Sequence, residues 1–372
     1  MKIPKVADIV GIINKIAPMS LAESWDNPGL QVGDPAAEVT RVMVALDPAP
    51  DVIDSALASS CQLLVTHHPL IFKPIKSLSA ATSNGAAIQK SIRGGLSIVC
   101  LHTNYDIAGD GLNDLLAAKI GLSSCVPLKV TSISEVVKLV VFVPVDQLEQ
   151  LRTALLPFAA NLGGYRDCSF AANGVGTFTP LDGAKPFTGM VGALSRVSEE
   201  RLELLILRES LPRAVKSLLS AHPYEEPAFD VYPLLNEGEK FGLGRIGYLP
   251  EPLALSEYAA QLRTALNAPM LRFVGDPSAR ISKVALCSGS GASLLHNAAR
   301  SGADVLVTGD VKYHEARDAE DLGLALIDAG HFPTEIIMVR EIVEKLGCAF
   351  VAAGYKDCRV EACLTEKDPF RI

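Results

Sequence analysis

The chain has 372 residues, of which 49% are apolar and 20% charged, and its net charge is −8. This apolar content is enough for two domains with hydrophobic cores and excludes a disordered chain. Acidic residues outnumber basic ones by 42 to 34, so the composition does not favour nucleic acid, whose phosphates attract clustered Lys and Arg. The longest strongly apolar stretch, VVKLVVFVPV at 136–145, is too short to cross a bilayer, and we expect no membrane partner.

The cysteines and the N-terminal segment predict a cytoplasmic protein. None of the eight cysteines forms a pair with the two-residue spacing of a zinc ribbon or a redox motif. Several lie in apolar runs, where a free thiol behaves as a small hydrophobic group, so a reducing compartment is the simplest interpretation. The first residues, MKIPKVADIVGIINKIAP, carry charges throughout and predict an amphipathic helix rather than a signal peptide.

The first third of the chain alternates strand and helix patterns. The run VTRVMVAL and two later runs are short and apolar, which is typical of buried strands. We expect strands at 39–46, 62–66 and 96–101, with helices at 50–61 and 86–93. Strands separated by helices pair in parallel, so this third predicts an α/β unit.

The middle of the chain predicts a separate, smaller α+β domain. Its patterns indicate strands at 136–145, 203–207 and 228–235, helices at 148–160 and 211–220, and Gly-rich turns at 161–165 and 173–177. This order suits a ferredoxin-like domain inserted at 127–243 into an outer domain formed by 1–126 and 244–372.

The last third repeats the plan of the first. Strands are expected at 281–287, 304–308 and 324–328, with a helix at 292–301. A chance match between short strands that end in Val-Thr is the alternative, but order and spacing both agree. We therefore predict one α/β outer domain made of two pseudo-symmetric halves.

Histidine and carboxylate side chains follow the ends of three predicted strands. Open α/β sheets bind their ligands outside the carboxyl ends of the strands, so these side chains should share one crevice. A lone histidine is usually structural, whereas an adjacent His-His pair together with two His/acid pairs favours Zn, Fe, Mn, Co or Ni. The residues are His67 and His68, His102 with Asp106, and His331 with Glu335.

The number of candidate ligands points to two ions. Pro333 favours a helix that begins here, and a spacing of four residues then brings Glu335 beside His331. Five or six ligands exceed what one tetrahedral ion needs, and two ions that share a carboxylate typically lie about 3.5–4 Å apart. His314, which follows the strand at 304–308, is near enough to be a neighbour of the site or to face a substrate.

Two glycine-rich motifs have different interpretations. The letters of a dinucleotide fingerprint occur at 242–247, but the following YLPEP cannot form the required helix, and we reject this motif. SGSGAS at 288–293 follows a predicted strand and opens a helix. Its backbone N–H groups either bind a phosphate or lie in a tight turn. The candidate phosphate-binding residues are Ser288, Gly289, Ser290 and Gly291.

Longer motifs around these residues resemble the Nif-three-like family, whose members are often named GTP cyclohydrolase type 2 homologues. In the outer domain they are SWDNPGLQVG at 24–33, LLVTHHPLIF at 63–72, LHTNYDIAGDGLND at 101–114, VTGDVKYHEA at 307–316 and DAGHFPTE at 328–335. In the middle, YRDCSF at 165–170 and AHPYEEPAFDVYPL at 221–234 resemble the PII/CutA-like insert of the longer family members. The resemblance covers nearly the whole chain.

The resemblance implies a dinuclear metal centre and a homohexameric ring. The family's ligand pattern falls on His67, His68, Asp106, His331 and Glu335, and it implies two divalent ions per chain. His102 occupies a position that is either a ligand or a neighbour of the ligands.

We therefore predict a metal-dependent hydrolase that acts on a nucleotide-like substrate. The family name implies ring-opening hydrolysis of GTP, with His102 and His314 as candidate proton carriers, because imidazole titrates near neutral pH. The alternative is a protein that stores or delivers metal, or a regulatory protein that binds a ligand without turnover.

Overall fold

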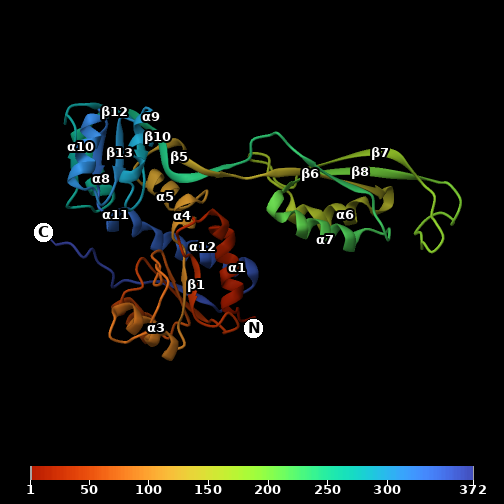
Figure 1. Ribbon diagram of the computed structural model, residues 1–372, viewed down its shortest axis with the longest axis horizontal. Helices are drawn as coiled ribbons and strands as arrows, with labels where there is room; N and C mark the ends of the chain where they lie inside the picture. The colour runs from red at the N-terminus through yellow and green to blue at the C-terminus, as the bar shows by residue number, and fades with distance from the viewer. Residues whose placement is uncertain (1, 372) are drawn as a thin grey trace. The chain divides into compact units, whose positions relative to one another are not determined.

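The computed structural model describes residues 2–371, and these residues form two compact units (Figure 1). One unit contains the chain up to Ser132 together with the chain from Phe241 onward, and the other contains Ile133–Lys240. Within the described residues, no helix is long and apolar enough to cross a membrane. The discontinuous unit is a mixed α/β structure with two sheets, which confirms the predicted α/β class.

The first sheet of the discontinuous unit has five strands, most of them from the N-terminal third. Three short apolar strands pair in parallel, and a fourth joins one edge in the antiparallel direction. The patterns at 39–46, 62–66 and 96–101 correspond to the parallel strands. From edge to edge the order is β1 (Gly29–Val32), β4 (Ser97–Cys100), β3 (Leu63–Thr66), β2 (Arg41–Ala45) and β15 (Arg359–Ala362).

The second sheet has six strands, and four of them repeat the arrangement of the first. Strands β12, β13 and β14 are parallel, and β11 is antiparallel at the edge, as β1 is in the first sheet. This order and direction are what two pseudo-symmetric halves would give. The sheet order is β11 (Arg272–Val274), β14 (Ala325–Asp328), β13 (Val305–Thr308), β12 (Arg280–Leu286), β10 (Lys240–Ala254) and β5 (Ser123–Ile133). The helices of this half are α8 (Leu255–Ala265), η5 (Ala292–Leu294), α9 (Leu295–Arg300) and α10 (Tyr313–Asp321).

Alternate residues of the short strands face helices on opposite sides of the first sheet, which explains why these strands are apolar throughout. In β2, Val42 and Val44 belong to the core that contains side chains of α1 and α12. Met43 and Ala45 belong instead to the core of α2 and α3. The helices span Val6–Ile16 (α1), Pro50–Ala58 (α2), Ser83–Arg93 (α3) and Ile337–Ala353 (α12).

Helix α5 (Leu112–Lys119) connects the hydrophobic cores of the two halves. Leu112 belongs to the core of α1 and α12, whereas Leu116 belongs to a core of the second sheet. On the same helix, Asp114 accepts hydrogen bonds of 2.6 and 2.8 Å from the guanidinium of Arg245, a residue of β10 that is 3% exposed. A shared helix and a partly buried ion pair therefore hold the two halves together.

The unit at Ile133–Lys240 has the element order βαββαβ of a ferredoxin-like fold. Its four strands are antiparallel, in the sheet order β7-β8-β6-β9, and both helices contribute to one core. The elements are β6 (Val136–Pro144), α6 (Leu148–Leu155), β7 (Ser169–Phe178), β8 (Ser195–Leu207), α7 (Leu211–Ala221) and β9 (Phe229–Pro233).

The Gly-rich turn predicted at 173–177 is wrong, because these residues lie inside strand β7. A Cβ atom at Gly176 would collide with the carboxylate of Glu199 on the neighbouring strand. Glu199 in turn accepts a hydrogen bond of 2.9 Å from the Tyr224 hydroxyl. The glycine therefore leaves room for this carboxylate within the sheet and does not mark a turn.

Candidate metal centre

Two adjacent histidines follow strand β3. The backbone N–H groups of His67 and His68 both donate to the carbonyl of Leu46, at 3.1 and 2.9 Å. The Thr66 hydroxyl donates to the carbonyl of His68 at 2.8 Å. The His67 ring is fully buried and the His68 side chain is 22% exposed. These bonds fix the two rings side by side at the strand end, with their centroids 5.2 Å apart.

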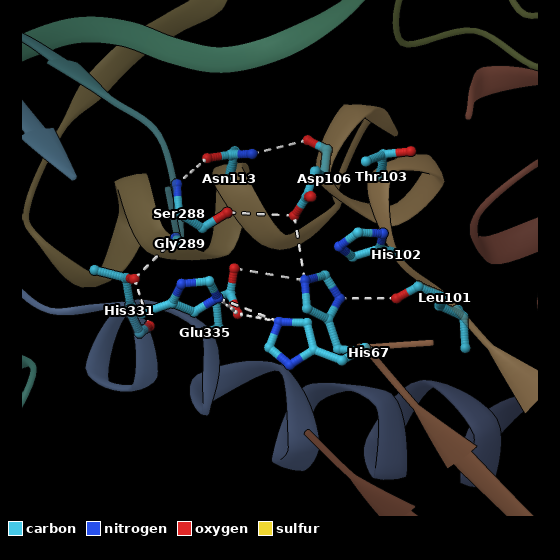
Figure 2. A network of polar contacts seen from close by, with 12 residues as sticks. His67, Leu101, His102, Thr103, Asp106, Asn113, Ser288, Gly289, His331 and Glu335 are labelled. Carbon is cyan, nitrogen blue, oxygen red and sulfur yellow. Dashed lines mark hydrogen bonds and ion pairs between the residues drawn. The ribbon is translucent and has the colours of Figure 1, made fainter. Parts of the chain in front are cut away.

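Each half also supplies a histidine and an acid from a short helix that follows its third parallel strand. Helix α4 (Thr103–Ile107) follows β4, with His102 immediately before it and Asp106 within it. Helix α11 follows β14, begins at His331 and ends one turn later at Glu335. The two His/acid pairs therefore occupy equivalent positions in the two halves, and Figure 2 shows their side chains meeting in one cluster.

Three donor atoms are spaced like the ligands of one metal ion. The Nε2 atoms of His68 and His331 lie 3.2 Å apart, and Oε2 of Glu335 lies 3.0 Å from the first and 2.9 Å from the second. Ligands bonded at about 2.1 Å to one ion are separated by roughly 3.0–3.4 Å, depending on the angle between the bonds. These three side chains, which we call the first ligand group, therefore fit a single ion.

Glu335 lies between the first ligand group and a second one. Its Oε1 atom is 3.7 Å from Nε2 of His67, while its Oε2 atom faces His68. The same nitrogen of His67 is 3.7 Å from Oδ1 of Asp106. His102 lies here too, because its ligand atom is within 4.8 Å of those of His67 and His68. The structure thus brings all five predicted ligands, and His102, into one cluster.

The outer nitrogen of each of these four histidines is held by an oxygen atom. Every Nδ1 lies 2.7 Å from its acceptor, so Nδ1 carries the hydrogen and Nε2 presents its lone pair to the cluster. Such anchoring is typical of metal-binding histidines, because it fixes the ring and makes the inner nitrogen a stronger ligand. The pairs are His67 with the Leu101 carbonyl, His68 with Asp47, His102 with Asp26, and His331 with Asp310.

Two buried polar atoms in the cluster have no hydrogen-bond partner within residues 2–371. They are Nε2 of His67 and Oε2 of Glu335. When the His68 and His331 rings are neutral, their Nε2 atoms present lone pairs to Oε2, and such a contact is not a hydrogen bond. A buried polar atom left unpaired costs about 1–3 kcal/mol. A cation satisfies a nitrogen lone pair and a carboxylate oxygen at once, so the donor set fits metal ions.

Negative charge dominates the cluster. Burial alone would lower the pKa of His68, but the neighbouring carboxylates of Asp47 and Glu335 raise that pKa to about 10. Burial also opposes the charged form of His331, yet Glu335 and Asp310 raise its pKa to about 9. Burial disfavours ionised Glu335 as well, but the surrounding histidines hold the pKa of this carboxyl well below its usual range. The site therefore favours positive charge beside its carboxylates, which bound metal ions would supply.

The SGSGAS loop supports the cluster from the second half. Three of its N–H groups already donate to side chains of the protein, at 2.8–3.0 Å, which favours the tight turn over the phosphate site. A Cβ atom at Gly289 would collide with the carboxylate of Glu335, so glycine allows the loop to approach the cluster. The bonds run from Ser288 to Asn113, from Gly289 to Thr334 and from Gly291 to Thr308.

His314 takes no part in the contacts of the cluster described above. It is exposed at the start of α10, where its ring packs edge-on against Tyr313 with centroids 5.5 Å apart.

The three carboxylates that anchor the histidines were not among the predicted site residues. Asp47 lies two residues after the end of β2, and Asp310 lies two residues after the end of β13. Both could have been found by looking for polar side chains at strand ends, as the histidines were. Asp26 lies 76 residues from its partner His102, and no local pattern joins the two.

The chain thus has a mixed α/β unit with two similar halves, which meet at four histidines and two carboxylates. This combination is that of a candidate metal-binding protein. Known protein families show which kind. The model of the family described as Duf34/NIF3 (NGG1p interacting factor 3) matches residues 4–369. The chain therefore belongs to the Duf34/NIF3 family, which confirms the family predicted from the motifs.

Related proteins match this chain over most of its length. Proteins named GTP cyclohydrolase 1 type 2 homolog from Halalkalibacterium halodurans and Bacillus subtilis are 41% and 39% identical to it. The alignments cover 100% and 91% of this chain, and 99% and 91% of those proteins. The crystal structure of a Bacillus cereus protein related to NIF3 superposes with a TM-score of 0.91 at 38% identity, with 100% of both chains covered.

Proposed function

We propose that this protein is a dinuclear, metal-dependent hydrolase that acts on a nucleotide-like substrate. The observation that carries the proposal is the position of Glu335, whose two oxygen atoms face different ligand groups as a shared carboxylate does in a two-metal site. The name GTP cyclohydrolase 1 type 2 homolog, carried by relatives at 41% and 39% identity, makes GTP the first substrate to test.

Two sets of side chains would hold the ions. One ion would lie among His68, His331 and one oxygen of Glu335. The other would lie among His67, Asp106 and the second oxygen of Glu335. Imidazole and carboxylate donors suit Zn, Fe, Mn, Co or Ni and leave positions for water. Divalent ions bound there would act as Lewis acids and lower the pKa of nearby water.

His102 is the candidate general base. Asp26 accepts the hydrogen of its Nδ1 at 2.7 Å, so Nε2 is available to take a proton from water at the cluster. Burial opposes the charge of Asp26, but hydrogen bonds from His102 and Thr103 lower the pKa of Asp26 to about 2. The ionised carboxylate would therefore stabilise the imidazolium that forms when His102 accepts the proton.

Metal analysis and nucleotide turnover test the proposal. Protein purified without added metal should contain two equivalents per chain, and the metal-loaded protein should hydrolyse GTP. Glu335→Gln keeps the size of the side chain but removes the shared charge, so it should lose at least one equivalent while the circular dichroism spectrum stays native. His68→Ala should abolish turnover. Full occupancy in Glu335→Gln, or no metal-dependent turnover across a broad panel of nucleotides and cyclic amides, would contradict the proposal.

The exposure of the first ligand group favours one alternative, metal storage or delivery. The His331 side chain is 33% exposed, whereas His67 is fully buried, so an ion in the first group lies nearer to solvent. A delivery protein should release this ion to a modest chelator, while a catalytic site should retain it. Stopped-flow measurements with a chromophoric chelator separate the two functions.

The resemblance to the Nif-three-like family supports two further proposals, one on the oligomeric state and one on the inserted domain. We propose a homohexamer, to be tested by analytical ultracentrifugation, and a PII/CutA-like regulatory domain at 127–243. Replacing Ile133–Lys240, the second compact unit, with a short Gly/Ser linker should leave an outer domain that binds two ions and unfolds cooperatively. An insoluble product, or no metal binding with several linker lengths, would show that these domain boundaries are wrong.

A further inference from the structure

Two exposed aromatic rings lie beside the cluster. Trp25 is 57% exposed and Phe72 is 46% exposed, and their ring centroids are 5.9 Å apart. The same centroids lie 6.1 and 6.3 Å from that of His102. The three rings meet edge to face, with interplanar angles of 66°, 78° and 81°. About half of each aromatic residue is therefore still accessible to a ligand despite this packing.

The residue after Trp25 anchors the loop that carries it. The buried carboxylate of Asp26 accepts the His102 Nδ1–H at 2.7 Å. It also accepts the Thr103 N–H at 3.0 Å and the Thr103 hydroxyl at 2.6 Å. One carboxylate therefore fixes both the backbone next to Trp25 and the ring of the candidate general base.

The loop that carries Phe72 is tied to the same segment. The Asn27 side chain donates to the Ile71 carbonyl at 2.6 Å. The Gln31 side chain donates to the Asn27 carbonyl at 2.6 Å and accepts the Ile71 N–H at 2.9 Å. Both aromatic residues thus lie next to backbone that polar contacts hold in place. Large apolar rings held at a fixed place in solvent indicate a binding surface, because a preorganised surface loses little entropy when a ligand binds.

We propose that Trp25 and Phe72 bind a planar heteroaromatic ring of the substrate, next to the bond that reacts at the metal cluster. The inference rests on the proposed function and assigns the base of the nucleotide to these residues. Open aromatic faces stack on nucleobases, since every base has a π face. The His102 ring contacts both aromatic rings and lies 5.3 Å from that of His67, so a bound base would be one side chain away from the ligands.

Trp25 is the single tryptophan of the chain, so its fluorescence reports directly on this surface. The full-length protein, in metal-free and metal-loaded forms, is titrated with guanosine, GTP and inorganic tripolyphosphate. Guanosine and GTP should quench the emission at saturable concentrations in both forms, whereas tripolyphosphate, which has no ring, should not. Quenching by none of the three, or equal quenching by tripolyphosphate, would overturn the inference.

Calorimetric titration of variants with guanosine tests whether Trp25 and Phe72 bind the base independently of the metal ligands. Phe72→Leu and Trp25→Leu should each weaken guanosine binding about 10-fold, which is within the range for loss of one stacking side chain. Both should keep the metal content of the parent protein. Phe187→Leu, which alters a phenylalanine of similar exposure (56%) in the other compact unit, is the matched control and should bind guanosine normally.

The outcomes distinguish this inference from the proposed hydrolase. Ring-dependent quenching without turnover of any nucleotide or cyclic amide in the panel supports the binding surface and contradicts the hydrolase. GTP turnover with unchanged guanosine affinity in Phe72→Leu and Trp25→Leu contradicts the surface and leaves the hydrolase intact. A Trp25 emission that shifts with protein concentration, and not with guanosine, would show that a second copy of the chain covers these rings and would overturn the inference.

Discussion

The carboxylate behind a histidine governs how well that histidine binds metal, and Asp47 allows a direct test. Asp47→Asn replaces the charged acceptor of His68 Nδ1 with a neutral amide of the same size. We expect the affinity for the ion of the first ligand group to fall about 10–100-fold, the usual effect of removing such an anchor. Competition with a chromophoric chelator measures the change.

The matched control for this prediction is Asp54→Asn. Asp54 forms an exposed ion pair with Lys90 on α2 and α3, so its loss should leave metal affinity unchanged. Equal affinity in Asp47→Asn and the parent protein would mean that the anchor does not tune the site.

His222 makes the inserted unit sensitive to mild acid. Its Nε2–H donates to the Phe142 carbonyl at 2.9 Å, and its Nδ1 accepts the Tyr224 N–H at 3.1 Å, so only the neutral ring satisfies both bonds. Burial lowers the pKa of His222 below its ordinary value of 6.5. The unfolded chain therefore binds the extra proton first, and the free energy of unfolding of this unit should fall as pH drops below about 6.5.

Hydrogen exchange of amides in the unit at Ile133–Lys240, compared at pH 7 and pH 5 after correction for intrinsic rates, measures this effect. His222→Gln should reduce the loss of protection between the two pH values. His296→Gln changes an exposed histidine of the other unit, and it should lose as much protection between the two pH values as the parent protein does. A pH response that survives in His222→Gln would assign it to other groups.

At the residue scale, the sequence predicted the site best where the functional residues are close together in the chain. His67 and His68 are adjacent, and His331 and Glu335 are one helical turn apart, so spacing alone brings them together. The contact between Asp26 and His102 depends on the antiparallel pairing of β1 with β4, which brings together residues that are 76 positions apart and which no periodicity encodes. The choice between turn and phosphate site at Ser288 depended on acceptors such as Asn113, 175 residues away.

At the scale of elements, the C-terminal tail contacts the segment that holds Asp47, the hydrogen-bond partner of His68. The Glu366 carboxylate accepts the backbone N–H groups of Leu46 and Asp47 at 2.8–2.9 Å, directly beside the anchor of His68. Glu366→Gln puts an amide NH₂ near these donors and should displace Asp47. We expect weaker binding of one metal equivalent, by several-fold, with the second equivalent unchanged.

Chelator competition resolved into two binding steps checks this prediction. Glu361→Gln in β15 alters a partly exposed ion pair with Arg41 and a contact with the Cys61 thiol, both away from the histidines, so it is the control and should bind both equivalents normally. Equal weakening of both equivalents in Glu366→Gln would point to general destabilisation of the unit rather than to positioning of Asp47.

Strands that are buried on both faces were predicted correctly from the sequence. Strands that depend on a partner far away in the chain were not. The parallel strands are continuous apolar runs because helices cover both of their faces. Strand β15 (Arg359–Ala362) is mixed in character and is recruited by pairing with β2, which is more than 300 residues away in the chain. Strand β7 contains glycines that resemble a turn until the carboxylate of Glu199 on the next strand is taken into account.

At the scale of the whole molecule, the cluster joins the two halves of the discontinuous unit. His67, His68 and Asp106 come from the first half, and His331 and Glu335 come from the second. Metal ions held by both sets would therefore act as cross-links in addition to α5 and the ion pair of Arg245 with Asp114. The pseudo-symmetric order of the two sheets explains why each half contributes a His/acid pair at the same position.

This arrangement predicts that metal removal destabilises one unit selectively. An ion bound only by the folded state at 100 times its dissociation constant contributes about 2.7 kcal/mol. For a unit of this size each kcal/mol shifts Tm by roughly 2–4 °C, so chelation should lower the transition of the discontinuous unit by at least about 5 °C. The ligand set lies wholly outside Ile133–Lys240, and the transition of that unit should not move. Calorimetry with and without chelator, with each transition assigned by hydrogen exchange, measures both. Equal shifts in the two units, or none in either, would show that the ions do not cross-link the halves.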